Sequence, residues 1–244
     1  MFEPTESLTS PMQFVPTKPF RNSSADPSAI AGLDFDVSST LSASVRSDLS
    51  RFGNELDAIE LLPALAASVR HGQSLAMLLK RGGSVLLASV FPTAQLYQCE
   101  VDLHALMPCE LEQLRLVRID AELAASPTGI EGSSMNPPRV APLRPLLWQI
   151  AEYGARTDLL PEIAGDVRYR LAPGFSTCDL PVEPSAMPLL RRLRTSTASF
   201  QDLSAWTVRG PARVCRLLNA LYLQAALMVL RTSPKSELPK SQHE

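Results

Sequence analysis

Residues Leu189–Leu230 read LLRRLRTSTASFQDLSAWTVRGPARVCRLLNALYLQAALMVL, and this stretch decides how the C-terminal part of the chain folds. Its apolar residues recur with the spacing of three successive helices. The first predicted helix starts with a leucine cluster, and the second follows a serine that is suited to cap it. The residues concerned are Leu189, Leu190 and Leu193 in the first helix, and Ser199, Phe200, Leu203 and Trp206 in the second.

The third predicted helix begins at Pro211, since proline is tolerated in the first turn of a helix. Apolar residues then recur at helical spacing through the longest apolar run of the chain, Leu217–Leu230. We expect this run to be one buried helix, too short to span a bilayer, which needs about 20 residues. Helix, short helix, turn and long helix are together typical of a winged-helix-like module. The predicted apolar stripe comprises Val214, Leu217, Leu218, Leu221, Ala225 and Met228.

Basic residues are concentrated at the C-terminal end of an otherwise acidic chain. The 244 residues carry a net charge of −2, yet residues 188–244 hold nine Lys and Arg against three Asp and Glu. Such a basic segment can face an acidic partner, a nucleic acid or the rest of its own chain. The candidate partner-binding residues are Arg191, Arg192, Arg194, Arg209, Arg213 and Arg216.

The N-terminal part of the chain divides into a tail and a small domain. Residues 1–50 are rich in Ser, Thr and Pro and are predicted to form a disordered tail. Residues 51–125 are predicted to form a small α+β domain that opens with a helix. Pro63 is expected to kink or restart this helix, and His71-Gly72 is expected to end it.

The rest of the small domain shows the patterns of strands. Two short apolar runs flank Gly82-Gly83, which is typical of a β-hairpin. Further strands are predicted within Gln95–Val101 and over Leu114–Ile119, where apolar and polar residues alternate. We therefore expect a small, mostly antiparallel sheet with a helix packed on it.

The C-terminal part begins after a segment rich in Pro, Gly and Ser. Residues 126–142 are predicted to be a linker or a long loop, and residues 143–231 the winged-helix-like module. A helix is predicted over Leu143–Tyr153 and a strand over Asp166–Leu171, while residues 232–244 are expected to be a disordered tail. The predicted fold class is α+β: a small, mostly antiparallel sheet with packed helices, plus a C-terminal three-helix module.

The sequence contains no pattern that specifies a reaction. Phosphate-loop, nucleophile-elbow and HExxH motifs are absent. Cys99, His104 and Cys109 are spaced more widely than zinc ligands, so we expect two buried thiols and a surface histidine. We predict no catalytic residue, no metal and no cofactor. The scattered cysteines and the lack of a visible signal peptide favour a cytoplasmic protein with reduced thiols.

Three segments, in this order, resemble the C-terminal half of PATAN-type bacterial regulatory domains. They read QIAEYGARTDLLPEIAGDVRYRLAP at Gln149–Pro173, LLRRLRTSTASFQDLSAW at Leu189–Trp206 and VCRLLNALYLQAALMV at Val214–Val229. The resemblance rests on apolar spacing and on a leucine-proline turn. It implies a bacterial signalling or regulatory protein that acts through protein–protein contacts, and it carries over no catalytic residue.

The predicted function is that of a non-enzymatic bacterial signalling adaptor or regulator. As the resemblance implies, its expected partner is a protein of a two-component or small-GTPase signalling pathway. The alternative is a DNA-binding transcriptional regulator whose basic C-terminal module contacts phosphates. The third predicted helix is mostly apolar and has no Asn or Gln in its first turn, which makes DNA the weaker prediction.

Overall fold

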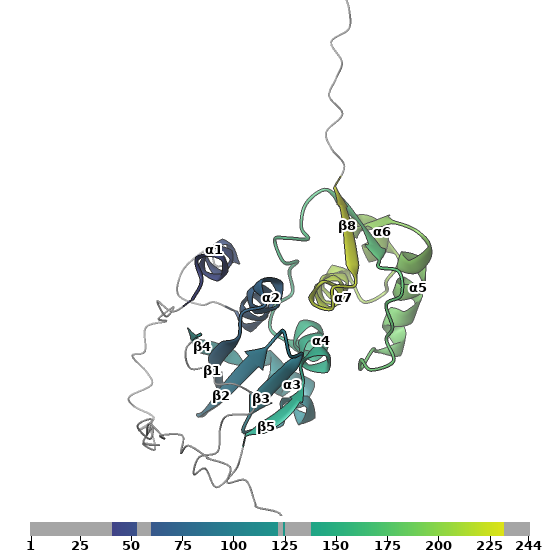
Figure 1. The fold of residues 1–244 in the computed structure, drawn as a ribbon. Coiled ribbons are helices and arrows are strands. Elements are labelled where there is room, and N and C mark those ends of the chain that lie inside the picture. Colours follow the sequence, from purple (N-terminus) through teal and green to yellow (C-terminus); the bar gives the residue numbers. More distant parts are fainter. Residues whose placement is uncertain (1–40, 53–59, 122–123, 125–137, 232–244) are drawn as a thin grey trace, which may run out of the picture. The chain divides into compact units, whose positions relative to one another are not determined.

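A computed structural model describes residues 41–52, 60–121, 124 and 138–231 of the chain (Figure 1). The described residues belong to one compact unit. The described residues of this unit hold helices α1–α7, an antiparallel five-stranded sheet and a three-stranded sheet. The predicted α+β class with a mostly antiparallel sheet is therefore confirmed.

The five-stranded sheet has the strand order β4-β1-β2-β3-β5, and each neighbouring pair is antiparallel. The predicted hairpin joins β1 to β2, and Gly82 in its turn adopts a positive φ of 57°, a conformation that glycine reaches without strain. The strands are β1 (Leu75–Arg81), β2 (Ser84–Phe91), β3 (Leu96–Cys99), β4 (Arg115–Asp120) and β5 (Arg139–Pro142).

The end of the predicted linker, residues 126–142, is a strand and not a loop. Residues 139–142 pair with β3 in the register Leu96↔Pro142 and Cys99↔Arg139, so the end of the segment belongs to the sheet. Proline favours a loop in the sequence, but an edge strand tolerates Pro142, because its backbone nitrogen, which carries no hydrogen, faces away from the neighbouring strand. Residues 126–137 lie outside the described part.

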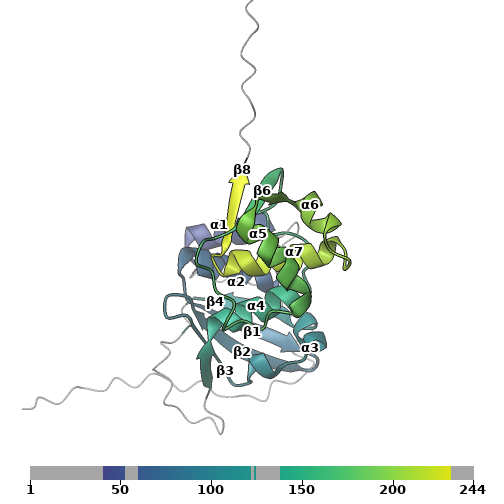
Figure 2. The same ribbon diagram turned by 90° about the vertical axis from the view of Figure 1, so that its right-hand side faces the viewer.

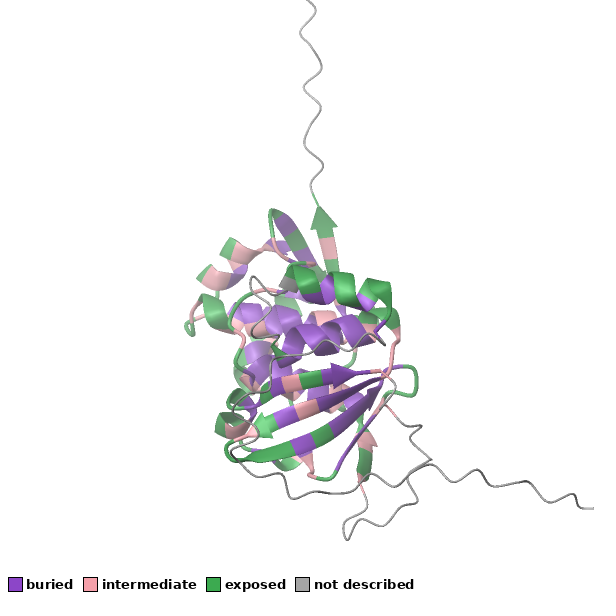
Figure 3. Ribbon diagram, turned by 90° about the vertical axis from the view of Figure 1, so that its left-hand side faces the viewer, coloured by how far each residue is buried: buried purple, intermediate pink, exposed green. Residues whose placement is uncertain are grey.

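Helices α2 (Leu61–His71) and α4 (Leu143–Tyr153) lie over the same face of the sheet. Alternate strand residues point toward them, and Figure 3 shows the buried positions gathered between the sheet and these helices. The short helices η2 (Leu103–Ala105) and α3 (Pro108–Glu112) precede β4. The core residues contributed by the sheet include Met77, Leu79, Leu86, Ala88, Val90, Tyr97 and Ile119.

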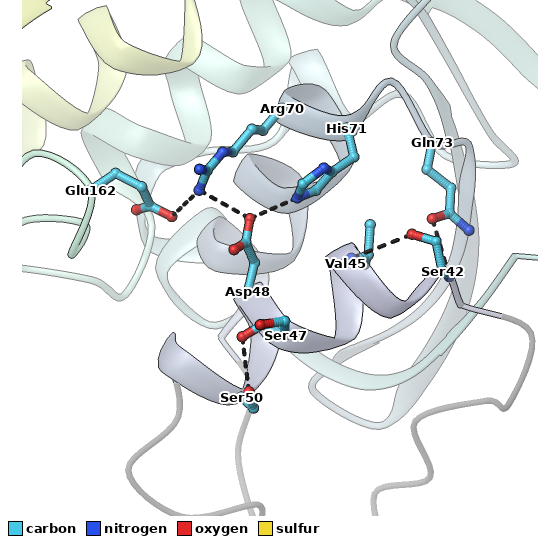
Figure 4. A network of polar contacts seen from close by, with 9 residues as sticks. All are labelled: Ser42, Val45, Ser47, Asp48, Ser50, Arg70, His71, Gln73 and Glu162. Atoms are coloured by element: carbon cyan, nitrogen blue, oxygen red, sulfur yellow. Dashed lines mark hydrogen bonds and ion pairs between the residues drawn. The ribbon is translucent and has the colours of Figure 1, made fainter.

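Helix α1 (Ala43–Phe52) lies inside the segment predicted to be a disordered tail. Val45 and Leu49 of this helix, and Leu41 just before it, are buried in the core, so the folded part begins before residue 50. Figure 4 shows how its Asp48 docks on α2: Oδ2 lies 3.1 Å from Arg70 Nη1 and 2.8 Å from His71 Nε2. The many serines hid this helix, because they occupy its exposed face. Residues 1–40 lie outside the described part.

Helix α2 ends where the sequence predicts and begins later. Gly72 takes a left-handed conformation, with φ of 63°, and its N–H caps the carbonyls of Ser68 and Val69. Of the kink or restart predicted at Pro63, the structure shows no kink inside the described helix, which starts at Leu61 and has Pro63 in its first turn. Proline in the first turn gives up no helical hydrogen bond. Residues 53–59, which were predicted to extend this helix, lie outside the described part.

The second sheet has the order β7-β6-β8, and its middle strand comes first in the chain. Helices α5, α6 and α7 pack beside it (Figure 2). The three predicted helices are present, while the winged-helix character of the module is not confirmed. The elements are β6 (Val167–Leu171), η3 (Pro184–Ala186), α5 (Met187–Thr195), β7 (Ala198–Ser199), α6 (Phe200–Ala205), α7 (Pro211–Leu223) and β8 (Leu227–Arg231).

The sequence predicts one helix over the apolar run Leu217–Leu230, and this prediction is wrong. Helix α7 ends at Leu223, Ala225 takes a positive φ of 53°, and Leu227–Arg231 pairs with β6 as strand β8. The predicted helix therefore extends beyond the true end of α7, because the apolar spacing of a buried helix and that of a strand cannot be told apart in an unbroken apolar run. Among the described helices, none is both long and apolar enough to cross a membrane.

Helices α4 and α7 join the two sheets. The Gln224 amide donates to the backbone carbonyl of Arg144 at 2.8 Å and accepts from Arg144 Nε at 3.0 Å. The buried Asn219 side chain accepts from the Leu160 N–H and donates to the Asp158 carbonyl, both at 2.9 Å. Apolar packing and satisfied polar groups thus hold the C-terminal helices on the first sheet's helical layer.

Candidate partner-binding surface

Helix α5 presents three of the six predicted arginines. Leu189, Leu190 and Leu193 are buried against the core, as their helical spacing predicts. The positions between these leucines therefore point outward, and Arg191, Arg192 and Arg194 are all exposed. Arg194 Nη2 also donates to the Phe175 carbonyl at 3.0 Å, which holds the guanidinium near the surface loop before α5.

Trp206, which is predicted on the apolar side of the second helix, is 38% exposed. It is the capping residue at the C-terminal end of α6, whereas Leu203 within the helix is buried. The guanidinium carbon of Arg192 lies 4.5 Å from the centre of the Trp206 ring, a distance suited to a cation–π contact. Val208, two residues further on, is fully exposed.

A groove of about 240 Å³ lies beside Trp206, and we call it the Trp206 groove. It runs between the start of α5, the turn from α6 to α7, and α7 itself. Leucine side chains lie at its base, and Arg209 lies at its rim. The lining residues are Ser185, Ala186, Pro188, Leu189, Trp206, Thr207, Val208, Arg209, Arg213 and Leu217.

Arg209 and Arg213 share Glu183, which lies just before η3, but they differ in exposure. The Arg209 side chain is 56% exposed and ion-pairs with one oxygen of Glu183. The Arg213 side chain is only 12% exposed, and it ion-pairs with the other oxygen of Glu183 and with Glu152 on α4. Arg213 therefore connects three parts of its own chain. The sequence predicts it as a partner-binding residue, but its side chain is turned inward.

Glu152 is the acidic centre of this inner cluster and is 2% exposed. Burial raises the pKa of Glu152 to about 7, and the attraction of Arg213 offsets only part of that cost. Oε2 is ion-paired with Arg213, and Oε1 makes neither an ion pair nor a hydrogen bond within the described residues. Burial acts in the same sense on Glu183, but a Ser185 hydrogen bond and the two arginines leave its pKa lowered. The pKa of Glu152 therefore lies close to neutral pH.

Arg216 is also turned inward. Its Nη2 donates to the Gly154 carbonyl at 3.2 Å, at the end of α4, and the residue is half-buried. The interpretation of Arg213 and Arg216 as phosphate-contacting residues therefore does not fit their positions. The six predicted arginines divide into an outer set, which is Arg191, Arg192, Arg194 and Arg209, and an inner set, which is Arg213 and Arg216.

Sequence reasoning missed Trp206 and Glu152 as members of this region. Trp206 stands just before the Gly210-Pro211 turn, where a short helix has already ended, and that position is a usable signal of exposure. Glu152 is the one acidic residue of the mostly apolar helix α4, which is a usable signal of a buried ion pair.

The residues at positions 99, 104 and 109 do not form a site. Cys99 is buried, Cys109 is exposed, and both ring nitrogens of His104 are engaged, by the Gln149 amide oxygen and the Pro142 carbonyl. The expectation of two buried thiols is therefore wrong for Cys109, while His104 is half-buried. Within the described ranges, no group of three or more His, Cys, Asp and Glu residues could hold a metal ion.

Comparisons with models of known protein families, with curated proteins and with solved structures find no match to this chain. The likeness to PATAN-type domains thus stays a prediction from the three quoted segments.

Proposed function

We propose that the protein is a non-enzymatic signalling adaptor or regulator that binds a protein partner at the Trp206 groove. The observation that carries this proposal is the exposed Trp206 ring, which lies under Arg192 and beside a groove with an apolar base. Tryptophan and arginine are the residues most enriched among the energetically dominant positions of protein interfaces. Trp206 and the fully exposed Val208 both line this groove, and neighbouring exposed apolar residues with polar residues at the rim are typical of interaction sites.

The chemistry of the surface specifies the kind of partner. A groove of about 240 Å³ accommodates one or two apolar side chains of another protein. Arg209 lines it and Arg192 lies against the Trp206 ring beside it, and of these two only Arg209 is ion-paired to an acid among the described residues. We therefore propose an acidic partner surface with an apolar side chain at its centre. The resemblance to PATAN-type domains favours a response regulator, a kinase or a small GTPase as this partner.

The proposal is tested with three full-length proteins: wild type, Trp206→Ala and the control Leu87→Ala. Leu87 is 41% exposed, which matches Trp206, but it lies on β2, away from the groove. Each protein is used to recover binding proteins from the native cell extract, and the recovered proteins are identified by mass spectrometry. We expect an acidic signalling protein with wild type and Leu87→Ala, weakened at least about tenfold with Trp206→Ala. Equal recovery by all three would reject the groove as the binding site.

The DNA-binding alternative has less support from the positions of the arginines. Arg213 and Arg216, at the start of α7, are engaged with Glu152, Glu183 and Gly154. A reading helix presents its first turn to base edges, and these side chains do not leave α7 free to do so. A duplex-DNA shift at two salt concentrations separates the proposals. A salt-sensitive shift that Arg191→Glu abolishes, with no protein recovered, would favour DNA.

A further inference from the structure

Strand β8 ends the second sheet with an open edge. It pairs with β6 on one side, and no described strand lies on its other side. Its sequence, LMVLR, has no proline and no charge before Arg231. A strand of this kind offers its unpaired backbone groups to another strand, and proteins normally protect such edges.

The pairing with β6 shows which backbone groups of β8 are free. The Ala172 N–H donates to the Ala226 carbonyl at 2.8 Å, and bonded pairs alternate along an antiparallel ladder. Met228 and Leu230 therefore bond to Arg170 and Arg168 of β6. The N–H and carbonyl groups of Leu227, Val229 and Arg231 consequently point away from β6, toward the open edge.

The other sheet edges in the described part are protected. Strand β4 carries Arg115, Arg118 and Asp120, and charges on an edge discourage strand addition. Strand β5 ends in a proline, and β7 has only two residues. Strand β8 has five residues, no proline, and a charge only at its last residue, Arg231, which is a reason to expect that its edge is used.

The side chains of β8 divide between two faces. Leu227 and Val229 pack against the core. Met228 and Leu230 lie on the opposite face and are 42% and 43% exposed. Arg231 donates to its own chain, from Nη2 to the Glu162 carbonyl at 3.0 Å, so its charge is held on its own side. The edge thus offers an apolar ribbon next to free backbone groups.

We propose that β8 pairs antiparallel with β8 of a second copy of this chain, about a two-fold axis at Val229. In this register the free groups of Val229 bond to those of the partner's Val229, and Leu227 and Arg231 bond to each other across the axis. Met228 faces Leu230 of the other copy, so apolar side chains meet on the exposed face. The two three-stranded sheets become one continuous sheet.

A second copy fits this edge better than an unrelated strand does. The two-fold register places no charge opposite a like charge, because Arg231 faces Leu227. In this register each free N–H of the strand donates to a free carbonyl of the other copy, and each free carbonyl accepts from an N–H.

The test is sedimentation velocity of the full-length chain over a wide range of concentrations. We expect a dimer for wild type, and a Kd about tenfold higher for Leu230→Lys, because two symmetry-related Met–Leu pairs are lost. The control Leu87→Lys changes an equally exposed leucine on a central strand and is expected to dimerise as wild type does. Circular dichroism of each variant checks that it is folded.

The register is tested by a compensating pair of substitutions. Leu230→Lys combined with Met228→Glu places an acid opposite a base across the axis, and we expect it to restore the wild-type Kd at low salt. A wild-type chain that stays monomeric up to about 1 mM overturns the proposal. A dimer that Leu230→Lys leaves unchanged overturns it too, as does binding of an extended peptide to β8 of a strictly monomeric chain.

Discussion

The inner and outer arginines of the C-terminal helices cannot be distinguished in the sequence, but their side chains point in opposite directions in the structure. Arg213, which is 12% exposed, joins α7 to α4 and to the segment before η3 through two carboxylates. Arg192 on α5 lies over Trp206 at the surface, where it is available to a partner. The comparison shows that arginines from one basic stretch of sequence can have two different environments: some neutralise acidic residues of their own chain, and others remain at the surface.

The largest expected difference between the two sets is in stability. Arg213→Met leaves the buried Glu152 without its cation, so we expect the free energy of unfolding at pH 8 to fall by about 3 kcal/mol. Urea denaturation followed by circular dichroism measures it. The control Arg191→Met, on the outer face of α5, is expected to change this energy by less than about 0.5 kcal/mol. Similar losses for both variants would erase the distinction between inner and outer arginines.

A second effect of the inner cluster is a dependence of stability on pH. The folded state raises the pKa of Glu152 to about 7 from an ordinary value of 4.5, so it binds the proton more tightly than the unfolded chain. The folded protein therefore loses stability as the pH rises from about 4.5 to 7, by on the order of 3 kcal/mol.

The variant Glu152→Gln removes this titration and keeps the size of the side chain. We expect its melting temperature to fall less than that of wild type between pH 5 and pH 8. Thermal melts of both proteins at several pH values give the comparison. Parallel pH profiles would mean that Glu152 is ionised throughout this range, with Arg213 and Arg216 neutralising it fully.

The smallest expected effect distinguishes two arginines that make the same kind of bond. Arg216 donates to the Gly154 carbonyl in a half-buried position, and Arg194 donates to the Phe175 carbonyl at the surface. We expect Arg216→Met to cost about 1 kcal/mol and Arg194→Met less than half of that, because water replaces the exposed bond. Urea midpoints of the two variants decide the matter, and a larger loss for Arg194→Met would contradict the assignment of inner and outer positions.

Part of the candidate surface could be predicted from the sequence. The leucines of α5 define its buried face, and this places Arg191, Arg192 and Arg194 outside. The exposure of Trp206 and the inward turn of Arg213 could not be predicted. Both depend on where α6 ends and on what α4 presents to α7, and these are contacts between segments far apart in the chain.

The limits of the elements show the same division. The cap at Gly72, the turn at Gly82, the capping serine Ser199 and the start of α7 at Pro211 were all predictable. Each depends on the conformation of one residue and its immediate neighbours. Strands β5 and β8 were missed, because each exists only through pairing with a strand that lies elsewhere in the sequence.

The sequence by itself determined the α+β class, most helix and strand positions of the described part, and the basic character of the C-terminal region. These follow from local propensity, apolar spacing and charge. Only the tertiary structure decided that Leu227–Arg231 is a strand with an open edge, and that two of the six arginines serve the core. The physical reason is that burial and strand pairing are properties of contacts, and a residue's partners are set by the packing of the whole unit.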